Sequence, residues 1–163
     1  MNALRIRNFS PEDMRAVIGI ILPIQRDEFG FAITEDDQPD LHDIPGFYQV
    51  GRGAFLVAEI DGRLVGTLGL KDIGARQGAL RKMFVESDFR GREHGVAQAL
   101  LHRLIDDARV QGLREIYLGT TEKFLAAHRF YDKNGFHAVA ADTLPSAFPR
   151  MAIDTRFYRL ALA

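Results

Sequence analysis

A short segment between Arg90 and Ala97 combines residue types that can bind a phosphate group through the backbone. It follows an apolar run that ends at Val85 and leads into a segment of helical periodicity. The first N–H groups of a helix have no acceptor within the helix and carry a partial positive charge, so they attract anions. Gly95 and Ala97 are small enough to let an anion approach, and Arg92 can add a direct contact. We therefore predict an anion cradle, suited to pyrophosphate, over these residues.

The sequence around the cradle predicts the elements that hold it. An apolar strand at 78–85 precedes it, and apolar positions from Val96 to Ala108 recur at helical spacing after it. Asp61-Gly62 separates two strand-length apolar runs within 54–71, which is typical of a two-residue hairpin turn. The further predicted elements are a strand at 4–7, a helix at 11–28, a second helix between 29 and 53, a strand at 113–119, a helix ending at Lys133, and strands at 136–139 and 151–162.

This order of elements predicts one domain over residues 1–163, of the mixed α/β (α+β) class. We expect a mostly antiparallel central sheet of about seven strands, flanked by about four helices. The length of 163 residues is that of one ordinary domain, and no repeat, low-complexity segment or linker divides it.

Two motifs within these elements resemble those of a known superfamily. Residues 92–97, Arg-Glu-His-Gly-Val-Ala, match the pattern of Arg or Gln, two residues, Gly, one residue, then Gly or Ala, between a strand and an amphipathic helix. Ala127 is followed by Phe130-Tyr131 and by 133–136, Lys-Asn-Gly-Phe, similar to a segment that ends in Tyr-x-Lys-x-Gly-Phe. Over about 54–139 the chain thus resembles the GNAT N-acetyltransferases, and the predicted elements fit a GNAT-like fold elsewhere.

The resemblance implies acetyl-CoA as the acyl-donor substrate. It places the pyrophosphate at the cradle, with contacts from Arg90, Arg92, Glu93, His94, Gly95, Val96, Ala97 and Gln98. It implies that a backbone N–H in the strand segment Met83, Phe84 and Val85 polarises the thioester carbonyl. It also implies that Tyr131 is the general acid that protonates the departing thiolate, although a half-buried packing residue is an alternative interpretation.

The acceptor side stays open at the level of sequence. The general base can be Glu59, His94 or His128, a chain of waters, or no residue at all if the amine arrives neutral. The acidic residues within 35–43 can line a pocket for a cationic amine or form a solvated loop. Arg150 can bind a substrate carboxylate or simply begin a strand.

Composition excludes several classes of partner and site. Lys and Arg total 21 against 22 Asp and Glu, so there is no broad basic face for nucleic acid. The absence of cysteine excludes disulfides, thiolate nucleophiles and cysteine-type zinc sites, and we expect no metal site. No apolar window approaches the roughly 18 residues of a membrane span, so we expect no membrane partner and a cytoplasmic location.

The leading hypothesis is an N-acetyltransferase that moves an acetyl group from acetyl-CoA to a primary amine of a small molecule or peptide by direct attack. The expected partners are acetyl-CoA and an unidentified amine acceptor, and the resemblance allows a homodimer. The alternative hypothesis is a non-catalytic CoA-binding sensor or regulatory module.

Overall fold

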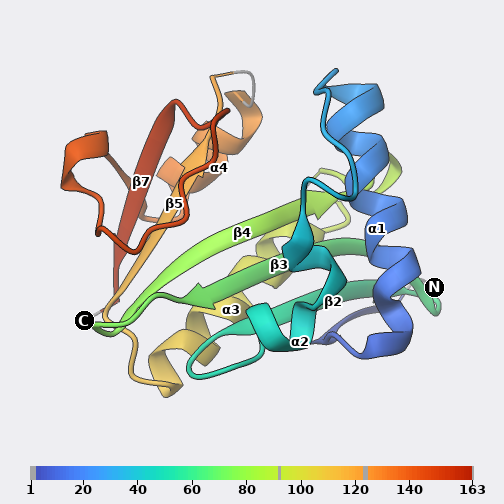
Figure 1. Cartoon of the computed structure of the whole chain (residues 1–163). Helices are drawn as coiled ribbons and strands as arrows, with labels where there is room; N and C mark the ends of the chain where they lie inside the picture. The colour runs from blue at the N-terminus through green and yellow to red at the C-terminus, as the bar shows by residue number, and fades with distance from the viewer. Residues whose placement is uncertain (1–2, 92, 123–124, 163) are drawn as a thin grey trace.

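The computed structural model describes residues 3–91, 93–122 and 125–162. Seven strands form one sheet in the order β1-β2-β3-β4-β5-β7-β6 (Figure 1). Within the described ranges β4 and β5 are parallel, and every other neighbouring pair is antiparallel. The strands are β1 (Leu4–Asn8), β2 (Ala54–Ile60), β3 (Arg63–Asp72), β4 (Gln77–Val85), β5 (Glu115–Thr120), β6 (His137–Val139) and β7 (Arg156–Ala161). The predicted mixed fold with a mostly antiparallel sheet is confirmed.

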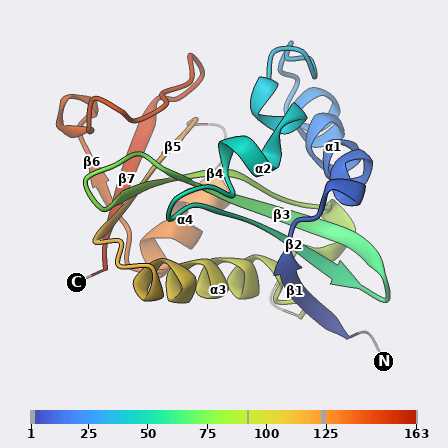
Figure 2. The same ribbon diagram turned by 60° about the horizontal axis from the view of Figure 1, so that its bottom comes forward.

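Helices cover both faces of the sheet, as Figure 2 shows. The described residues form α1 (Met14–Pro23), α2 (Ile44–Phe47), α3 (Val96–Val110) and α4 (Leu125–Lys133). α1 and α2 lie on one face, while α3 and α4 lie on the other. The predicted hairpin turn also forms, since Asp61 and Gly62 both have positive φ, at 53° and 81°.

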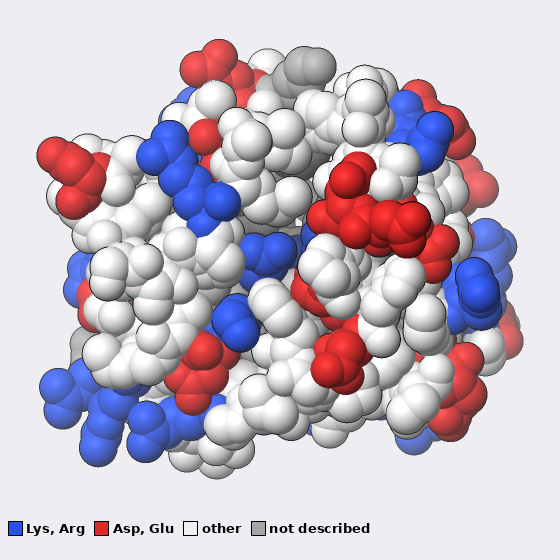
Figure 3. All heavy atoms as spheres, viewed as in Figure 1, with Lys and Arg blue, Asp and Glu red and all other residues white. Residues whose placement is uncertain are grey.

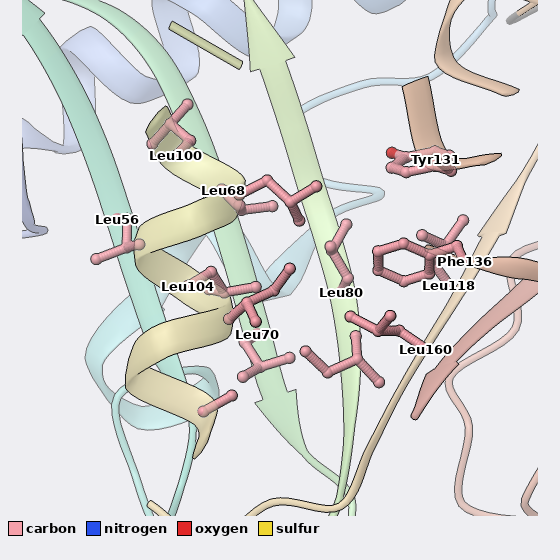
Figure 4. Packing of buried hydrophobic residues seen from close by; sticks show 14 of the residues in the cluster. Leu56, Leu68, Leu70, Leu80, Leu100, Leu104, Leu118, Tyr131, Phe136 and Leu160 are labelled. Carbon is pink, nitrogen blue, oxygen red and sulfur yellow. The ribbon is translucent and has the colours of Figure 1, made fainter. Parts of the chain in front are cut away.

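The two faces of the sheet enclose separate apolar clusters because successive side chains of a strand point to opposite faces. Leu56 of β2 packs with the α3 cluster, whereas its neighbour Phe55 packs with the α1 cluster. Figure 4 shows the first cluster, in which Leu100 and Leu104 of α3 lie near the sheet and Tyr131 reaches in from α4. The core therefore holds α3 and α4 against the strands that surround the cradle.

The predicted helix at 11–28 forms as three consecutive segments. A 3₁₀ turn (Pro11–Asp13) precedes α1, and a π-helical turn (Ile24–Glu28) follows it. Pro23 explains the change, because it cannot donate to the carbonyl of Gly19 and its ring crowds that carbonyl. The helical stretch begins at Pro11, as predicted. At this start the Asp13 carboxylate accepts a hydrogen bond from the Ser10 N–H at 2.9 Å.

Two other elements are shorter than predicted. All of residues 29–53 are described, and they form a 3₁₀ turn (Pro39–His42) and the four-residue α2 in place of a longer helix. Each begins with a proline in its first turn, which limits helix growth toward the N-terminus. The final strand begins at Arg156 and not at 151, because the Asp154 carboxylate accepts the Met151 N–H at 2.9 Å and closes a turn.

Candidate active site

The sheet opens between its two parallel strands. β4 and β5 pair from Gln77 opposite Glu115 to Ala79 opposite Tyr117. β4 then continues to Val85 beside β3, while β5 continues beside β7. Figure 1 shows the two strands diverging beyond their short pairing. The carboxyl ends of parallel strands are frequent ligand sites in open sheets.

A β-bulge interrupts β4 beside this opening. Two residues of β4, Lys82 and Met83, face a single residue of β3. Lys82 has a left-handed φ of 55°, and its carbonyl accepts a hydrogen bond from the Thr67 hydroxyl at 2.7 Å. Bulges re-aim side chains and often lie next to active sites.

Backbone donors after the bulge point into the opening. The Glu86 N–H donates to the Val65 carbonyl at 2.9 Å, on the β3 side. Successive N–H groups of a strand point to opposite edges, so those of Met83 and Val85 face the edge that β5 has left. Within the predicted segment 83–85, Phe84 therefore has its N–H directed toward β3. Two backbone donors remain for a ligand that lies along β4.

The predicted anion cradle lies at the start of α3. Gly95 precedes the helix with a left-handed φ of 66°, and the first helical hydrogen bond joins the Ala99 N–H to the Gly95 carbonyl at 3.0 Å. The N–H groups of Val96, Ala97 and Gln98 therefore belong to the open first turn, where the helix dipole is positive. Three convergent donors at this point can hold a phosphate.

The arginine expected at the cradle is held by the protein itself. Arg90 donates to both carboxylate oxygens of Glu28, and its Nε donates to the Val85 carbonyl at 2.8 Å. Arg90 thus joins the loop to the end of the N-terminal helical segment and to the end of β4. Arg92 lies outside the described residues.

The remaining cradle residues have neighbours within the loop and α4. The Glu93 carboxylate lies close to Gly91: a Cβ added at Gly91 would be 2.9 Å from Glu93 Oε2. The His94 ring packs against Phe89, with ring centroids 5.6 Å apart. The Gln98 side chain points toward the end of α4, where its Nε2 donates to Asn134 Oδ1 at 2.9 Å. Backbone groups, more than side chains, are therefore available for the anion.

Two cavities meet at the opening. The cradle cavity, of about 440 Å³, runs from Arg90 and Ala97 to Tyr131 and has a mainly apolar lining. The inner cavity, of about 130 Å³, lies between β4, the segment after α1 and the loop before β7. Their shared lining residues are Met83, Phe84, Ala127 and Tyr131. Figure 3 shows this face of the molecule hollowed at its centre, with Lys and Arg atoms inside the hollow.

Tyr131 stands where the two cavities meet. It lies one turn after Ala127 on α4, and Figure 4 shows its hydroxyl directed toward β4. The hydroxyl lies 3.8 Å from the Met83 sulfur. Burial raises the pKa of Tyr131, so the phenol keeps its proton at neutral pH. It can donate that proton, or a hydrogen bond, to an atom placed between the cavities.

Three charged residues line the inner cavity, Arg81, Lys82 and Asp154, and sequence reasoning named no side chain of the three as part of the site. Burial lowers the pKa of Lys82 to about 8, against the opposing effect of Asp40. Burial also raises the pKa of Asp154, which reaches the cavity from the loop before β7. The one sequence signal for Lys82 was a charged pair, with Arg81, inside an otherwise apolar strand.

The three side chains named as base candidates lie elsewhere. Glu59 pairs with two arginines of β1. His128 Nε2 lies 2.9 Å from the Thr121 carbonyl, and the His94 ring packs against the loop. Among the described lining residues of the two cavities, Glu59, His94 and His128 are absent. The structure therefore brings none of these three to Tyr131.

The acidic stretch at 35–43 behaves mainly as a capped loop. Asp37 accepts from the Thr34 N–H, and Asp43 accepts from the Gly46 N–H. Asp40 points inward and accepts the Tyr48 hydroxyl at 2.6 Å. These acidic residues and Arg150 are not among the described residues that line the inner cavity, which favours the solvated-loop interpretation.

Within the described ranges, no group of three or more His, Asp or Glu side chains is arranged to hold a metal ion. The helices in those ranges are all too short or too polar to cross a membrane.

Comparison with known proteins places these features in one family. Residues 20–136 match the acetyltransferase (GNAT) family. An N-acetylaspartate synthetase from Danio rerio is 35% identical over 134 residues, which are 76% of this chain and 47% of that protein. The chain thus spans about half the length of the curated relatives it matches.

Solved structures agree with that match. A GNAT-family acetyltransferase from Staphylococcus aureus Mu50 has a TM-score of 0.95 and 37% identity, over 99% of this chain and 100% of that one. The PaiA N-acetyltransferase from Thermoplasma acidophilum, in complex with coenzyme A, shares the fold at a TM-score of 0.73 and 16% identity, over 98% and 99% of the two chains. This chain belongs to the acetyltransferase (GNAT) family.

Proposed function

We propose that this protein is an N-acetyltransferase that moves the acetyl group of acetyl-CoA to a primary amine, and that residues 1–163 act as one catalytic domain. The observation that carries the proposal is the position of Tyr131, whose buried hydroxyl lies where the cradle cavity meets the inner cavity. A thioester at that point would have a proton donor beside its sulfur and room for an acceptor beyond its carbonyl. Membership of the GNAT family supports the same reaction.

The shape of the cradle cavity supports CoA as the carrier. Its outer end is formed by the first turn of α3, whose N–H groups suit the pyrophosphate. Along β4, the N–H groups of Met83 and Val85 can bond to the amide-containing pantetheine arm or to the thioester carbonyl. The PaiA neighbour, which has the same fold, was crystallised with coenzyme A.

The proposed step is direct attack by a neutral amine on the thioester carbonyl carbon. A C–N bond forms, and the carbonyl oxygen gains negative charge that a β4 N–H would stabilise. The C–S bond then breaks, and Tyr131 gives its proton to the departing sulfur. The nitrogen releases one proton to solvent, and solvent returns one to Tyr131, so the products are an N-acetyl amide and free CoA thiol.

The proposed acceptor is a small amine that fits the inner cavity. The Danio rerio relative is named for an acetylated amino acid, which supports an acceptor of that size. The general base is proposed to be water, or to be unnecessary for an amine that arrives neutral, because the three side-chain candidates lie away from the cavity.

Two measurements test this function. Acetyl-CoA at 100 times its Kd should stabilise the fold by about 2.7 kcal/mol, which is a Tm rise of about 5 to 10 °C. A thiol reagent should then report CoA release in the presence of an amine panel, without background from the protein because the chain has no cysteine. An unchanged Tm at millimolar acetyl-CoA would contradict the proposal. Binding without CoA release from any amine would favour the non-catalytic CoA-binding module.

A further inference from the structure

We infer that the inner cavity binds a carboxylate group of the acceptor and that the Lys82 ammonium is its anchor. The inference rests on the proposed acetyltransferase function and names the class of acceptor, a small amine that also carries a carboxylate. Lys82 is then a binding residue that sets specificity, separate from the proton donor Tyr131.

Lys82 has hydrogen-bond donors to spare. Its side chain is 3% exposed and lines the inner cavity. Nζ donates to Gln38 Oε1 at 2.6 Å, while Asp40 Oδ2 lies 3.8 Å away, beyond hydrogen-bond distance. That Asp40 oxygen already accepts the Tyr48 hydroxyl at 2.6 Å. Among the described residues, a buried group with three donors therefore has one close acceptor, and an acceptor oxygen in the cavity would satisfy another.

Burial, and not a lack of nearby carboxylates, governs the charge of Lys82. The Asp40 carboxylate lies 3.9 Å from Arg81 and 3.8 Å from Lys82, and Asp154, which also lines the cavity, acts on Lys82 as a second acidic group. The pKa of Lys82 is still lowered to about 8, because burial outweighs the counter-charge of both carboxylates. A ligand carboxylate on the spare donors of Lys82 would stabilise its ammonium form further.

Arg81 has a different role because two of its donors hold neighbouring parts of the protein. Its Nε donates to the Tyr48 hydroxyl at 3.2 Å, and Nη1 donates to the Pro149 carbonyl at 3.0 Å. Arg81 thus fixes one wall of the cavity, the loop that contains Pro149. Lys82 is the more deeply buried of the two cations, with a side chain 3% exposed against 14% for Arg81, and it has one close acceptor for its three donors.

The rest of the cavity fits an acceptor with both charges. Asp154 lines the cavity from the loop before β7, and its carboxylate complements the amine of such an acceptor. The volume of about 130 Å³ is close to the roughly 150 Å³ that accommodates a benzene molecule, so a compact acceptor fits better than a peptide chain.

The test compares acids with their amides. With acetyl-CoA saturating, CoA release is measured for glycine, L-alanine and L-aspartate and for the matching carboxamides, which keep the amine and lose a carboxylate charge. A charge-assisted hydrogen bond predicts that kcat/KM falls about 10- to 100-fold from acid to amide. Equal kcat/KM for acids and amides would overturn the inference and leave the acetyltransferase function standing.

The variant Lys82→Met identifies the anchor. It should raise KM for the acid about 10- to 100-fold, change kcat little, and remove most of the difference between acid and amide. Lys82→Arg should recover part of the preference. Lys71→Met is the matched control, since Lys71 lies on β3 outside both cavities, and it should behave as the wild type.

Failure of Lys82 as the carboxylate anchor and failure of the acetyltransferase function give different results. A retained Tm shift with acetyl-CoA shows that Lys82→Met keeps the fold and the donor site. If the acid-to-amide difference is then the same in Lys82→Met and wild type, Lys82 is not the anchor. If no amine of any class releases CoA from the wild type, the acetyltransferase function itself fails.

Discussion

Tyr131 and Tyr158 are neighbouring buried tyrosines whose hydroxyl groups have different surroundings. Their ring centroids are 5.8 Å apart. The Tyr131 hydroxyl lies at the junction of the two cavities, whereas the buried Tyr158 hydroxyl has no hydrogen-bond partner among the described residues. The pair therefore allows the same chemical change to be made at the proposed acid and at a nearby position.

Tyr131→Phe should lower kcat about 10²- to 10⁴-fold, because it removes the proton for the departing sulfur and keeps the ring. The Kd for acetyl-CoA should change little, since the donor contacts are backbone groups of β4 and α3. Steady-state CoA release and a thermal-shift titration measure the two quantities. A variant with wild-type kcat would show that Tyr131 is a packing residue.

Tyr158→Phe is the control for that change. It should leave kcat unchanged and hold or raise Tm, because a buried hydroxyl without a partner costs about 1 to 3 kcal/mol. A similar loss of kcat in both variants would point to a general effect of changing this buried tyrosine pair, and would argue against a proton supplied by Tyr131.

Sequence reasoning could name Tyr131 and Gly95 as candidates because both lie in local motifs with recognisable spacing. It did not locate Lys82 or Asp154, because their place in one cavity depends on a bulge and on contact between segments 72 residues apart in sequence. It also named His128 as a base candidate, since spacing on a helix cannot show that the ring bonds to the Thr121 carbonyl.

At the scale of elements, α3 begins and ends with glycines that can be compared. Gly95 has φ 66° and Gly112 has φ 82°, and a Cβ at either would meet no atom within 4 Å. Gly95→Ala and Gly112→Ala should each cost about 1 kcal/mol of stability through the left-handed backbone. The two variants should therefore lose the same amount of folding stability, so any difference between them in ligand binding reports on the cradle.

Gly95→Ala alone should weaken acetyl-CoA binding, by about 10-fold or more, because its methyl group lies at the end of α3 that carries the cradle. Isothermal titration with acetyl-CoA measures the Kd of both variants. An equal Kd for the two variants would place the pyrophosphate away from the start of α3.

Elements with strong local signals were predictable, and those shaped by distant contacts were not. The hairpin at Asp61-Gly62 and the helix after Gly95 formed as expected, because turn chemistry and apolar spacing are local. The π-helical turn after Pro23 and the short α2 depart from apolar periodicity where proline constrains the backbone. The bulge at Lys82 has no local signal, because it reflects the register between β3 and β4.

At the scale of the molecule, the sheet consists of two parts joined by a short parallel pairing. β1 to β4 form one antiparallel set and β5 to β7 form the other, with three residue pairs between them. The strand count was predictable from apolar runs. The position of β5 between β4 and β7 was not, because it depends on long-range pairing.

Amide exchange can show whether the donor bridges these two parts. In the free protein the N–H groups of Met83 and Val85 should exchange faster than that of Glu86, which bonds to the Val65 carbonyl. Acetyl-CoA should slow exchange at Met83 or Val85 and leave Glu86 nearly unchanged, as measured by residue-resolved NMR. Protection confined to α3 would contradict a donor that lies along β4.

The short joint between β4 and β5 has a thermodynamic consequence. If acetyl-CoA tightens the joint, then linkage requires a tighter joint to favour acetyl-CoA by the same factor. A substitution at Gln77 or Glu115, whose side chains hydrogen-bond at 2.9 Å across the joint, would then change donor affinity without touching either cavity. The strength of the parallel pairing would then set donor affinity from a position outside both cavities.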